Sequence, residues 1–369
     1  MKKFLVLILA LMLFTGVASV FSDAAEDAFN ELVNTLVGTM EGDFSLLLDG
    51  LGQDLDPILM QNALDGQNIG MAELGSKRFN HFYFSILPTV SITAANGVFT
   101  FTDTQAYEDS LVLKGMLDSI LFDEEEGLLG SLLANEDYEV LADVLLNKAT
   151  PIPALKLNAG AKLPSNIELL LYGMWVPPFL WDMIPADTMS SLPDGLMPTF
   201  NYLNIGAELR YVLLRDSKDT PGVSIGLGGA YNHLLLGVGL GDLLYESLGD
   251  SLGTIPASFG ADYNPFEDAG MEFSSDTIVL GINTTISKKL AVLYPFIKLG
   301  AYYAITDFSG IATLTETAVI EGGDGHNDMD MLVSTGFDLM LGPLGTNLTV
   351  DYNLGSGVWG LDLGSRLQF

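Results

Sequence analysis

The chain has three histidines that could serve as the base of a hydrolytic site, His81, His233 and His326. A hydrolytic site needs a base beside a Ser or Asp, because the base must polarise the nucleophile or a water molecule. His81 opens the first expected strand, at the end away from the long loops, and Ser224 lies too far along its strand to partner His233. The sequence therefore predicts no catalytic residue and a protein that is not an enzyme.

Metal binding would depend on the stretch Gly322–Asp330, which concentrates oxygen ligands. Asp324, Asp328 and Asp330 could encircle Ca²⁺. However, the stretch lacks the spacing of an EF-hand and its distal Glu. A solvated acidic loop is the preferred interpretation, so neither a metal nor a cofactor is expected.

Alternation with a period of two dominates the chain after residue 80. Hydrophobic residues make up 49% of the sequence, and no run beyond the N-terminus is long and apolar enough for a transmembrane helix. The apolar residues must then lie in a core or face lipid from alternating strands. Ten segments are expected to be strands: His81–Thr93, Ala154–Lys162, Ile167–Val176, Phe200–Leu213, Val223–Gly237, Ser274–Ser287, Ala291–Thr306, Met329–Leu341, Thr346–Asn353 and Val358–Phe369.

The last twelve residues show this alternation most clearly. One parity holds Trp359, Leu361, Leu363, Leu367 and Phe369, and the other holds Gly360, Asp362, Gly364, Arg366 and Gln368. An extended chain would present one apolar and one polar face. The stretch resembles the closing strand of bacterial outer-membrane β-barrel proteins, which ends on Phe. The resemblance implies that Phe369 is an assembly signal for the barrel-assembly machinery.

The N-terminus has the layout of an export signal. Lys2 and Lys3 precede the apolar run Phe4–Phe14, and small residues follow at Thr15–Ser19. The run is too short to span a membrane, so residues 1–22 are expected to be a Sec-type signal peptide. Export and barrel-like strands together place the protein in the bacterial outer membrane.

Connection lengths support a barrel, because outer-membrane barrels join strands by short periplasmic turns and longer external loops. The short links are Leu163–Asn166, Leu214–Gly222, Lys288–Leu290 and Gly342–Gly345, and the long ones are Ala94–Pro153, Pro177–Thr199, Val238–Phe273 and Asp307–Asp328. Val98–Thr102 and Ile311–Ile320 could form hairpins beyond the membrane or belong to a larger barrel. The prediction is an all-β antiparallel barrel of about ten strands, within a range of ten to fourteen.

Aromatic residues near the expected strand ends fit the girdles that barrels place at the membrane interfaces. They are Trp175, Trp181, Tyr202, Tyr211, Tyr302, Tyr303 and Trp359.

The polar parity of the strands predicts which charged residues line the lumen, because charges do not persist on the lipid face near the midplane. These residues are Lys156, Lys162, Glu208, Arg210, Lys298, Asp338, Asp351, Asp362 and Arg366. One interpretation is a set of cross-strand ion pairs that hold the wall in shape. The other is a lined passage for a polar or amphiphilic solute.

Residues 23–80 are expected to be helical, either in the periplasm or as a plug, and residues 81–369 to form the barrel. Phe29–Met40 repeats apolar residues at helical spacing, and shorter helical pieces are expected at Ser45–Leu51 and Pro57–Leu64. The first external loop, between Tyr107 and Lys148, is rich in Leu and is expected to be helical. Such apolar helices must pack on each other, on the barrel mouth or on a ligand.

In outline, plug-like helices, barrel and helical loop are similar to the long-chain fatty-acid outer-membrane transporter family. The resemblance implies a plug inside the barrel and external helices that collect a hydrophobic ligand. The family's Asn-Pro-Ala start is missing, so no ligand-binding residue is carried over.

The formal net charge of −32, from 47 acidic and 15 basic residues, argues against nucleic acid as a partner. We expect a barrel that passes small hydrophobic or amphiphilic molecules by passive transport. Its expected partners are outer-membrane lipids, the assembly machinery and a hydrophobic small molecule. The alternative is a structural or adhesive surface barrel without transport, and an outer-membrane hydrolase is less favoured.

Overall fold

The computed structural model describes residues 44–46, 48, 50, 52, 59–60, 82–94, 149–176, 198–239, 269–315, 318–341 and 344–368. The expected signal peptide, the helices at Phe29–Met40 and in the first external loop, and Phe369 lie outside these residues. The described residues from 44 to 60 are helical, in agreement with the two helical pieces expected there. Among the described residues, no helix is long and apolar enough to cross a membrane.

All ten expected segments are strands. They are β1 (Phe82–Ala94), β2 (Ala149–Lys162), β3 (Ile167–Val176), β4 (Pro198–Leu214), β5 (Gly222–Gly239), β6 (Gly270–Ser287), β7 (Leu293–Thr315), β8 (Ala318–Leu341), β9 (Leu344–Asn353) and β10 (Trp359–Gln368). Each strand pairs antiparallel with its sequence neighbours, and β1 pairs with β10, which closes the barrel. The predicted ten-stranded antiparallel barrel is confirmed.

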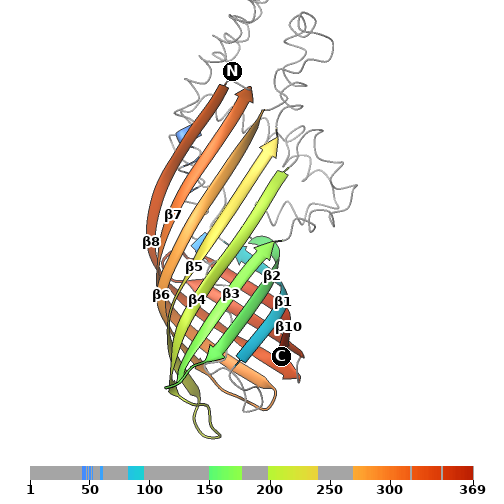
Figure 1. Cartoon of the computed structure of the whole chain (residues 1–369), viewed down its shortest axis with the longest axis vertical. Helices are drawn as coiled ribbons and strands as arrows, with labels where there is room; N and C mark the ends of the chain where they lie inside the picture. Colours follow the sequence, from blue (N-terminus) through green and yellow to red (C-terminus); the bar gives the residue numbers. More distant parts are fainter. Residues whose placement is uncertain are drawn as a thin grey trace, which may run out of the picture.

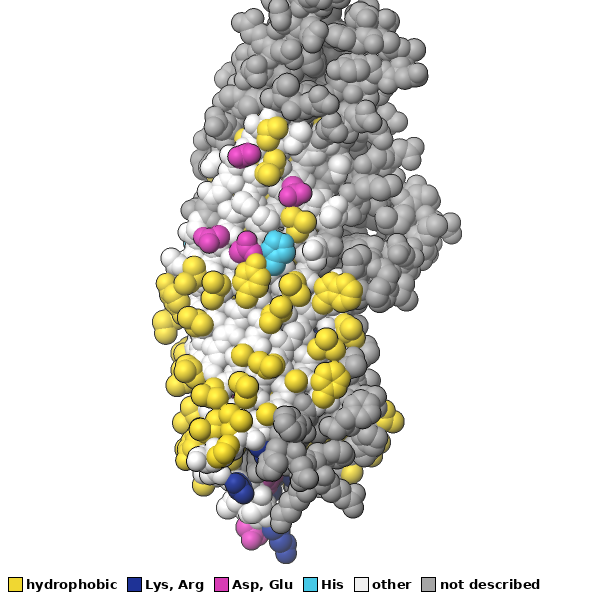
Figure 2. All heavy atoms as spheres, viewed as in Figure 1, with side chains coloured by type: hydrophobic (Ala, Val, Ile, Leu, Met, Phe, Trp, Pro, Cys, Tyr) yellow, Lys and Arg dark blue, Asp and Glu magenta, His cyan; other side chains and the backbone are white. Residues whose placement is uncertain are grey.

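The alternation of side chains sorts the barrel into a polar interior and an apolar exterior. On β4, for example, Glu208 and Arg210 are buried, whereas Leu209 between them is exposed. We call the exposed apolar side chains around the middle of the barrel the apolar belt: Leu171, Ile205, Leu209, Ile225, Leu227, Ile278, Leu280, Ile282, Ile297, Leu299, Ile305, Met331, Phe337, Val350 and Leu363. Figure 2 shows hydrophobic side chains covering the lower half of the described surface, with acidic side chains and a His above them. Such a surface suits lipid on the outside of the wall.

The strands differ greatly in length. β7 and β8 have 23 and 24 residues, whereas β3, β9 and β10 have 10 each. About nine to eleven residues of a tilted strand cross a bilayer, so the upper parts of the long strands extend beyond the belt. Figure 1 shows β4–β8 rising past β1 and β10 on one side of the barrel. The extension lies opposite the short turns, on the side that is external by the rule of short periplasmic turns.

The predicted external loop Asp307–Asp328 is wrong, because these residues continue β7 and β8 as a paired hairpin. Ile311–Ile320 was expected to form either a hairpin beyond the membrane or part of a larger barrel, and it forms the hairpin. Inward-facing Ala312 and Ile320 are buried near its tip, so this hairpin has an apolar inner face of its own. Val98–Thr102 lies outside the described residues.

The predicted aromatic girdle is only partly correct. Trp175, Tyr211, Tyr303 and Trp359 are exposed on the outer surface, but Tyr202 and Tyr302 are buried inside the barrel. Neighbouring residues in a strand point to opposite faces, so Tyr302 and Tyr303 could not both belong to the girdle. Trp181 lies outside the described residues.

Candidate functional site

The interior of the barrel holds the charged residues that parity assigned to the lumen. Lys156, Glu208, Arg210, Lys298, Asp338, Asp351 and Asp362 are buried, and Lys162 is half-buried. The side chain of Arg366 lies outside the described part, although its backbone pairs with Gly345 in β9. We call these buried charges the charged layer.

The centre of the charged layer is Glu208. Its Oε1 accepts a hydrogen bond from Arg210 Nε at 2.9 Å, and its Oε2 lies 3.7 Å from Lys298 Nζ. The three side chains come from β4 and β7, on the half of these strands nearer the short turns. The carboxylate is shared by the two cations and offsets part of their buried positive charge, which would be costly to bury without a counter-charge.

Further ion pairs join nearby strands along the inner wall. Lys156 on β2 lies 3.0 Å from Asp362 on β10, and Lys162 lies 3.9 Å from Glu168 on β3. These contacts correspond to the ion-pair interpretation of the lumen charges. The charged layer therefore links strands around the wall.

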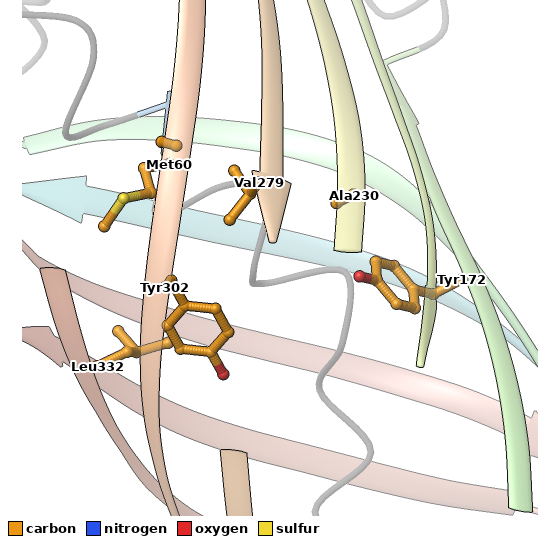
Figure 3. Packing of buried hydrophobic residues seen from close by; sticks show 7 residues of the cluster. Met60, Tyr172, Ala230, Val279, Tyr302 and Leu332 are labelled. Atoms are coloured by element: carbon orange, nitrogen blue, oxygen red, sulfur yellow. The ribbon is translucent and has the colours of Figure 1, made fainter. Parts of the chain in front are cut away.

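On the external side of Glu168 in β3 and of Lys298 in β7 lie inward-facing aromatic residues, which we call the aromatic layer. Tyr172 and Tyr302 point into the barrel and pack with Val279, Leu332 and Met60 (Figure 3). Glycines on the same or neighbouring strands make room for the rings: a Cβ at Gly206 would collide with the Tyr172 ring, and one at Gly281 or Gly300 with the Tyr302 ring. The Tyr172 hydroxyl donates to the carbonyl oxygen of Gly229 on β5 at 3.0 Å, which fixes the ring against the wall over β4.

The N-terminal residues Leu59 and Met60 are part of this layer. Leu59 packs with Met174, Tyr202 and Leu234. The Asn232 side chain donates from Nδ2 to the carbonyl oxygen of Leu59 at 2.7 Å, and its Oδ1 accepts from Asn204 Nδ2 at 2.5 Å. A buried backbone carbonyl is thus bound by a side chain from the wall, as buried polar groups require.

Closer to the external end, Phe44 and Leu48 cover the inner face of the extended strands. The Phe44 ring lies 6.3 Å from that of Phe273 on β6. A Cβ at Gly322 of β8 would lie 2.6 Å from Leu48 Cδ1, and one at Gly310 of β7 would also collide with this side chain. The two glycines therefore let a helical residue approach the sheet backbone.

The acidic residues of Gly322–Asp330 do not form a metal-binding loop, because this stretch belongs to β8. Asp328 Oδ1 accepts from Met329 N at 2.7 Å, and Asp330 Oδ1 accepts from Met331 N at 2.6 Å. Asp330 also binds the β9–β10 turn through Gly355 N at 2.6 Å and Ser356 N at 3.0 Å. These carboxylates act as acceptors for backbone amides, and no group of three acidic or His ligands converges within the described residues.

His233 has an acidic partner, but the pair lies on the outer wall. His233 Nδ1 lies 3.0 Å from Asp276 Oδ1, which also accepts a hydrogen bond from the Tyr231 hydroxyl. The nearby hydroxyls of Ser274 and Ser309 bond to each other at 2.5 Å, and Ser224 is buried on the opposite face. Among the described residues, therefore, no hydroxyl is held against this imidazole as a nucleophile would be. His326 lies on the inward parity of β8, and His81 lies outside the described residues.

The cluster of Tyr231, His233 and Asp276 stands immediately above the apolar belt, since Ile278 is the next outward residue below Asp276. Partial burial raises the pKa of Asp276, but hydrogen bonds from Tyr231 and His233 outweigh this effect, and the pKa lies below its usual value. We expect Tyr231→Phe to move the pKa of Asp276 upward, because the carboxylate loses a donor. Carboxyl NMR titration of labelled protein in nanodiscs would measure this, and an unchanged pKa would show that the hydroxyl does not stabilise the charge.

A closed antiparallel barrel with an outward apolar belt satisfies every backbone group within its own wall, as a membrane-spanning structure must. This chain forms a transmembrane β-barrel. The outer-membrane location expected from the sequence agrees with this fold. No protein-family model matches the chain, and no curated protein is significantly similar to it in sequence.

Solved structures with a similar arrangement include bacterial outer-membrane barrels. The translocator domain of the autotransporter NalP from Neisseria meningitidis is 7% identical, with 86% of this chain and 96% of that chain covered and a TM-score of 0.38. The outer-membrane protease OmpT from Escherichia coli is 8% identical, with 81% and 100% covered and a TM-score of 0.39. A major outer-membrane protein from Thermus thermophilus is 10% identical, with 78% and 99% covered and a TM-score of 0.29. These similarities are too distant to transfer an activity, and the resemblance to fatty-acid transporters stays a prediction.

The uncharged residues of the interior were not predicted from the sequence. Tyr172, Tyr302 and Asn232 share the inward parity of Glu168, Lys298 and Ser224 on their strands, so the same parity rule would have assigned them. The contacts of Leu59 with Asn232 could not be predicted, because no local pattern relates residues this far apart in the chain.

Proposed function

We propose that the barrel passes small hydrophobic or amphiphilic molecules by passive transport and that the N-terminal segment is the plug that closes it. The observation that carries this proposal is the burial of Leu59 and Met60 among Tyr172, Met174 and Tyr302. The space these two side chains fill is apolar. If the segment moved, the same wall would offer an apolar lining to a small molecule.

The polarity of the interior supports an amphiphilic solute. The aromatic layer would suit an apolar chain, while Asn232 and Asn204 offer amide groups beside it. The charged layer below must rearrange for any solute to pass, because its ion pairs are buried. The proposed transport therefore needs motion at two levels, the plug and the charged layer.

Deleting Asp23–Gly75 tests this function. We expect liposomes containing the deletion variant to take up p-nitrophenyl glucoside, a neutral amphiphile that is not a detergent, several-fold faster than liposomes containing the full chain. Native mass spectrometry of protein purified from its own membrane should also reveal a retained apolar molecule. If nothing apolar is retained and the deletion variant is no faster than empty liposomes, the transport proposal is wrong.

A structural or adhesive barrel is the second candidate. The observation that favours it is the burial of the charged layer. Buried ion pairs stabilise a closed wall, and a structural barrel does not require them to separate. This candidate predicts an unchanged, closed barrel after the deletion. Catalysis is not part of either proposal.

A further inference from the structure

The turns at the periplasmic end form a basic rim on a strongly acidic protein. The β4–β5 turn carries Arg215 and Lys218, and the β6–β7 turn carries Lys288 and Lys289. These four cations stand against two acids, Asp216 and Asp219, whereas the whole chain has 47 acidic and 15 basic residues. We call these two turns the basic rim. In Figure 2, Lys and Arg side chains gather at this lower end, below the hydrophobic band.

The two turns are tied into one platform by Lys288. Its ammonium group donates to Asp216 Oδ1 at 3.3 Å, to the carbonyl oxygens of Lys218 at 3.2 Å and Thr220 at 3.0 Å, and to that of Ser217. The other oxygen of Asp216 accepts from Lys289 N at 2.5 Å. Asp216 is thus engaged by the platform itself, which leaves the outward cations of the rim with Asp219 as the opposing charge.

The three remaining cations are exposed, and two of them are held in place. Arg215 donates from one guanidinium nitrogen to Asn166 Oδ1 at 2.6 Å, which links the β2–β3 turn to the rim. Lys289 lies over the Tyr294 ring, 5.4 Å from its centroid. Both side chains keep further N–H groups for a ligand, because a guanidinium has five donors and an ammonium three.

Exposed apolar residues continue the belt directly into the rim. A register shift at Val212/Leu214 places the consecutive residues Leu213 and Leu214 outward, where ordinary alternation would bury one of them. Leu214 is 54% exposed and Leu290 is 53% exposed, each next to a cation of the rim. Val292 extends the same surface at 43% exposure.

Cations that adjoin a lipid-facing apolar surface match the chemistry of an anionic phospholipid. Its phosphate would meet Arg215, Lys218 and Lys289, while its acyl chains would lie on Leu214 and Leu290. We propose that the basic rim is a binding site for an anionic phospholipid of the inner leaflet. The continuity of the rim with the belt favours a lipid over an acidic protein or free phosphate, since neither of those uses the exposed leucines.

Lipid retention tests this site independently of transport. The full-length protein would be reconstituted in nanodiscs of equal phosphatidylglycerol and phosphatidylethanolamine, extracted, and examined by native mass spectrometry. We expect phosphatidylglycerol to be retained preferentially. The triple variant Arg215→Gln/Lys218→Gln/Lys289→Gln should reduce that preference at least about ten-fold, because each cation near an anionic lipid contributes attraction. Lys288 is left unchanged so that the turns stay tied.

Two further variants separate charge from fold. Arg215→Lys/Lys289→Arg keeps the charge and should retain the preference, and Leu214→Ser/Leu290→Ser keeps the cations but should weaken retention. Equal retention of both lipids by the unmodified protein would overturn the proposal. So would displacement of phosphatidylglycerol by millimolar inorganic phosphate, or retention by the serine variant equal to that of the unmodified protein, since both would make the acyl chains irrelevant.

Discussion

Replacing Glu208 by Gln should destabilise the barrel by about 3–5 kcal/mol, the usual cost of removing one partner from a buried ion pair. Glu208 is the carboxylate between Arg210 at 2.9 Å and Lys298 at 3.7 Å, and all three side chains are almost completely buried. Glutamine keeps the size and shape of the side chain but leaves two neighbouring cations without their shared counter-charge. The loss of stability therefore comes from the charge alone.

Urea unfolding in detergent, followed by the shift in gel mobility between folded and unfolded barrel, would measure this effect. Glu272→Gln makes the same chemical change at an exposed site on β6 and should change stability by no more than about 0.5 kcal/mol. If Glu208→Gln fails to assemble, the double variant Glu208→Gln/Lys298→Met should recover part of the stability, because one of the two cations facing the neutral side chain is gone. Unfolding of Glu208→Gln at the urea concentration of the unmodified protein would contradict the account of the charged layer.

The strands could be predicted from sequence wherever lipid faces the wall. Within the bilayer, a charged side chain that faces lipid is too costly. The residue type alone therefore predicts that Leu209 faces lipid and Glu208 faces the interior. Tyr302 has the same parity as Lys298, so its side chain should also point inward. It was predicted to face outward because aromatic residues near strand ends are typical of the membrane interface. The ten strands and the inward charges follow from this one constraint.

The same rule fails above the membrane, where both faces of a strand can be polar. Gly322, Gly323 and Asp324 have the composition of a turn, yet they belong to β8. The reason is packing: Gly322 makes room for Leu48, and a Cβ at Gly323 would lie 2.7 Å from the carbonyl oxygen of Phe308. From sequence alone, a strand glycine that makes room for a neighbouring group cannot be distinguished from a glycine in a turn, because the neighbouring group is not known.

A reversible disulfide between the N-terminal segment and the wall should switch transport off. An ideal Cβ at Gly310 would lie 3.1 Å from Leu48 Cγ, which brings the two positions near the Cβ separation of about 3.5–4.5 Å found in disulfides. The chain contains no Cys, so Leu48→Cys/Gly310→Cys introduces a single reactive pair. Oxidation would hold the segment against β7, and reduction would release it.

Uptake of p-nitrophenyl glucoside into liposomes containing this double variant, measured before and after reduction, tests most directly whether movement of the N-terminal segment opens the barrel. The two single-Cys variants serve as controls and should not respond to reductant. The account predicts that a disulfide forms, that uptake in the oxidised protein falls to the level of empty liposomes, and that reduction restores it. Equal uptake in the oxidised and reduced states, with the disulfide verified by mass spectrometry, would contradict the account.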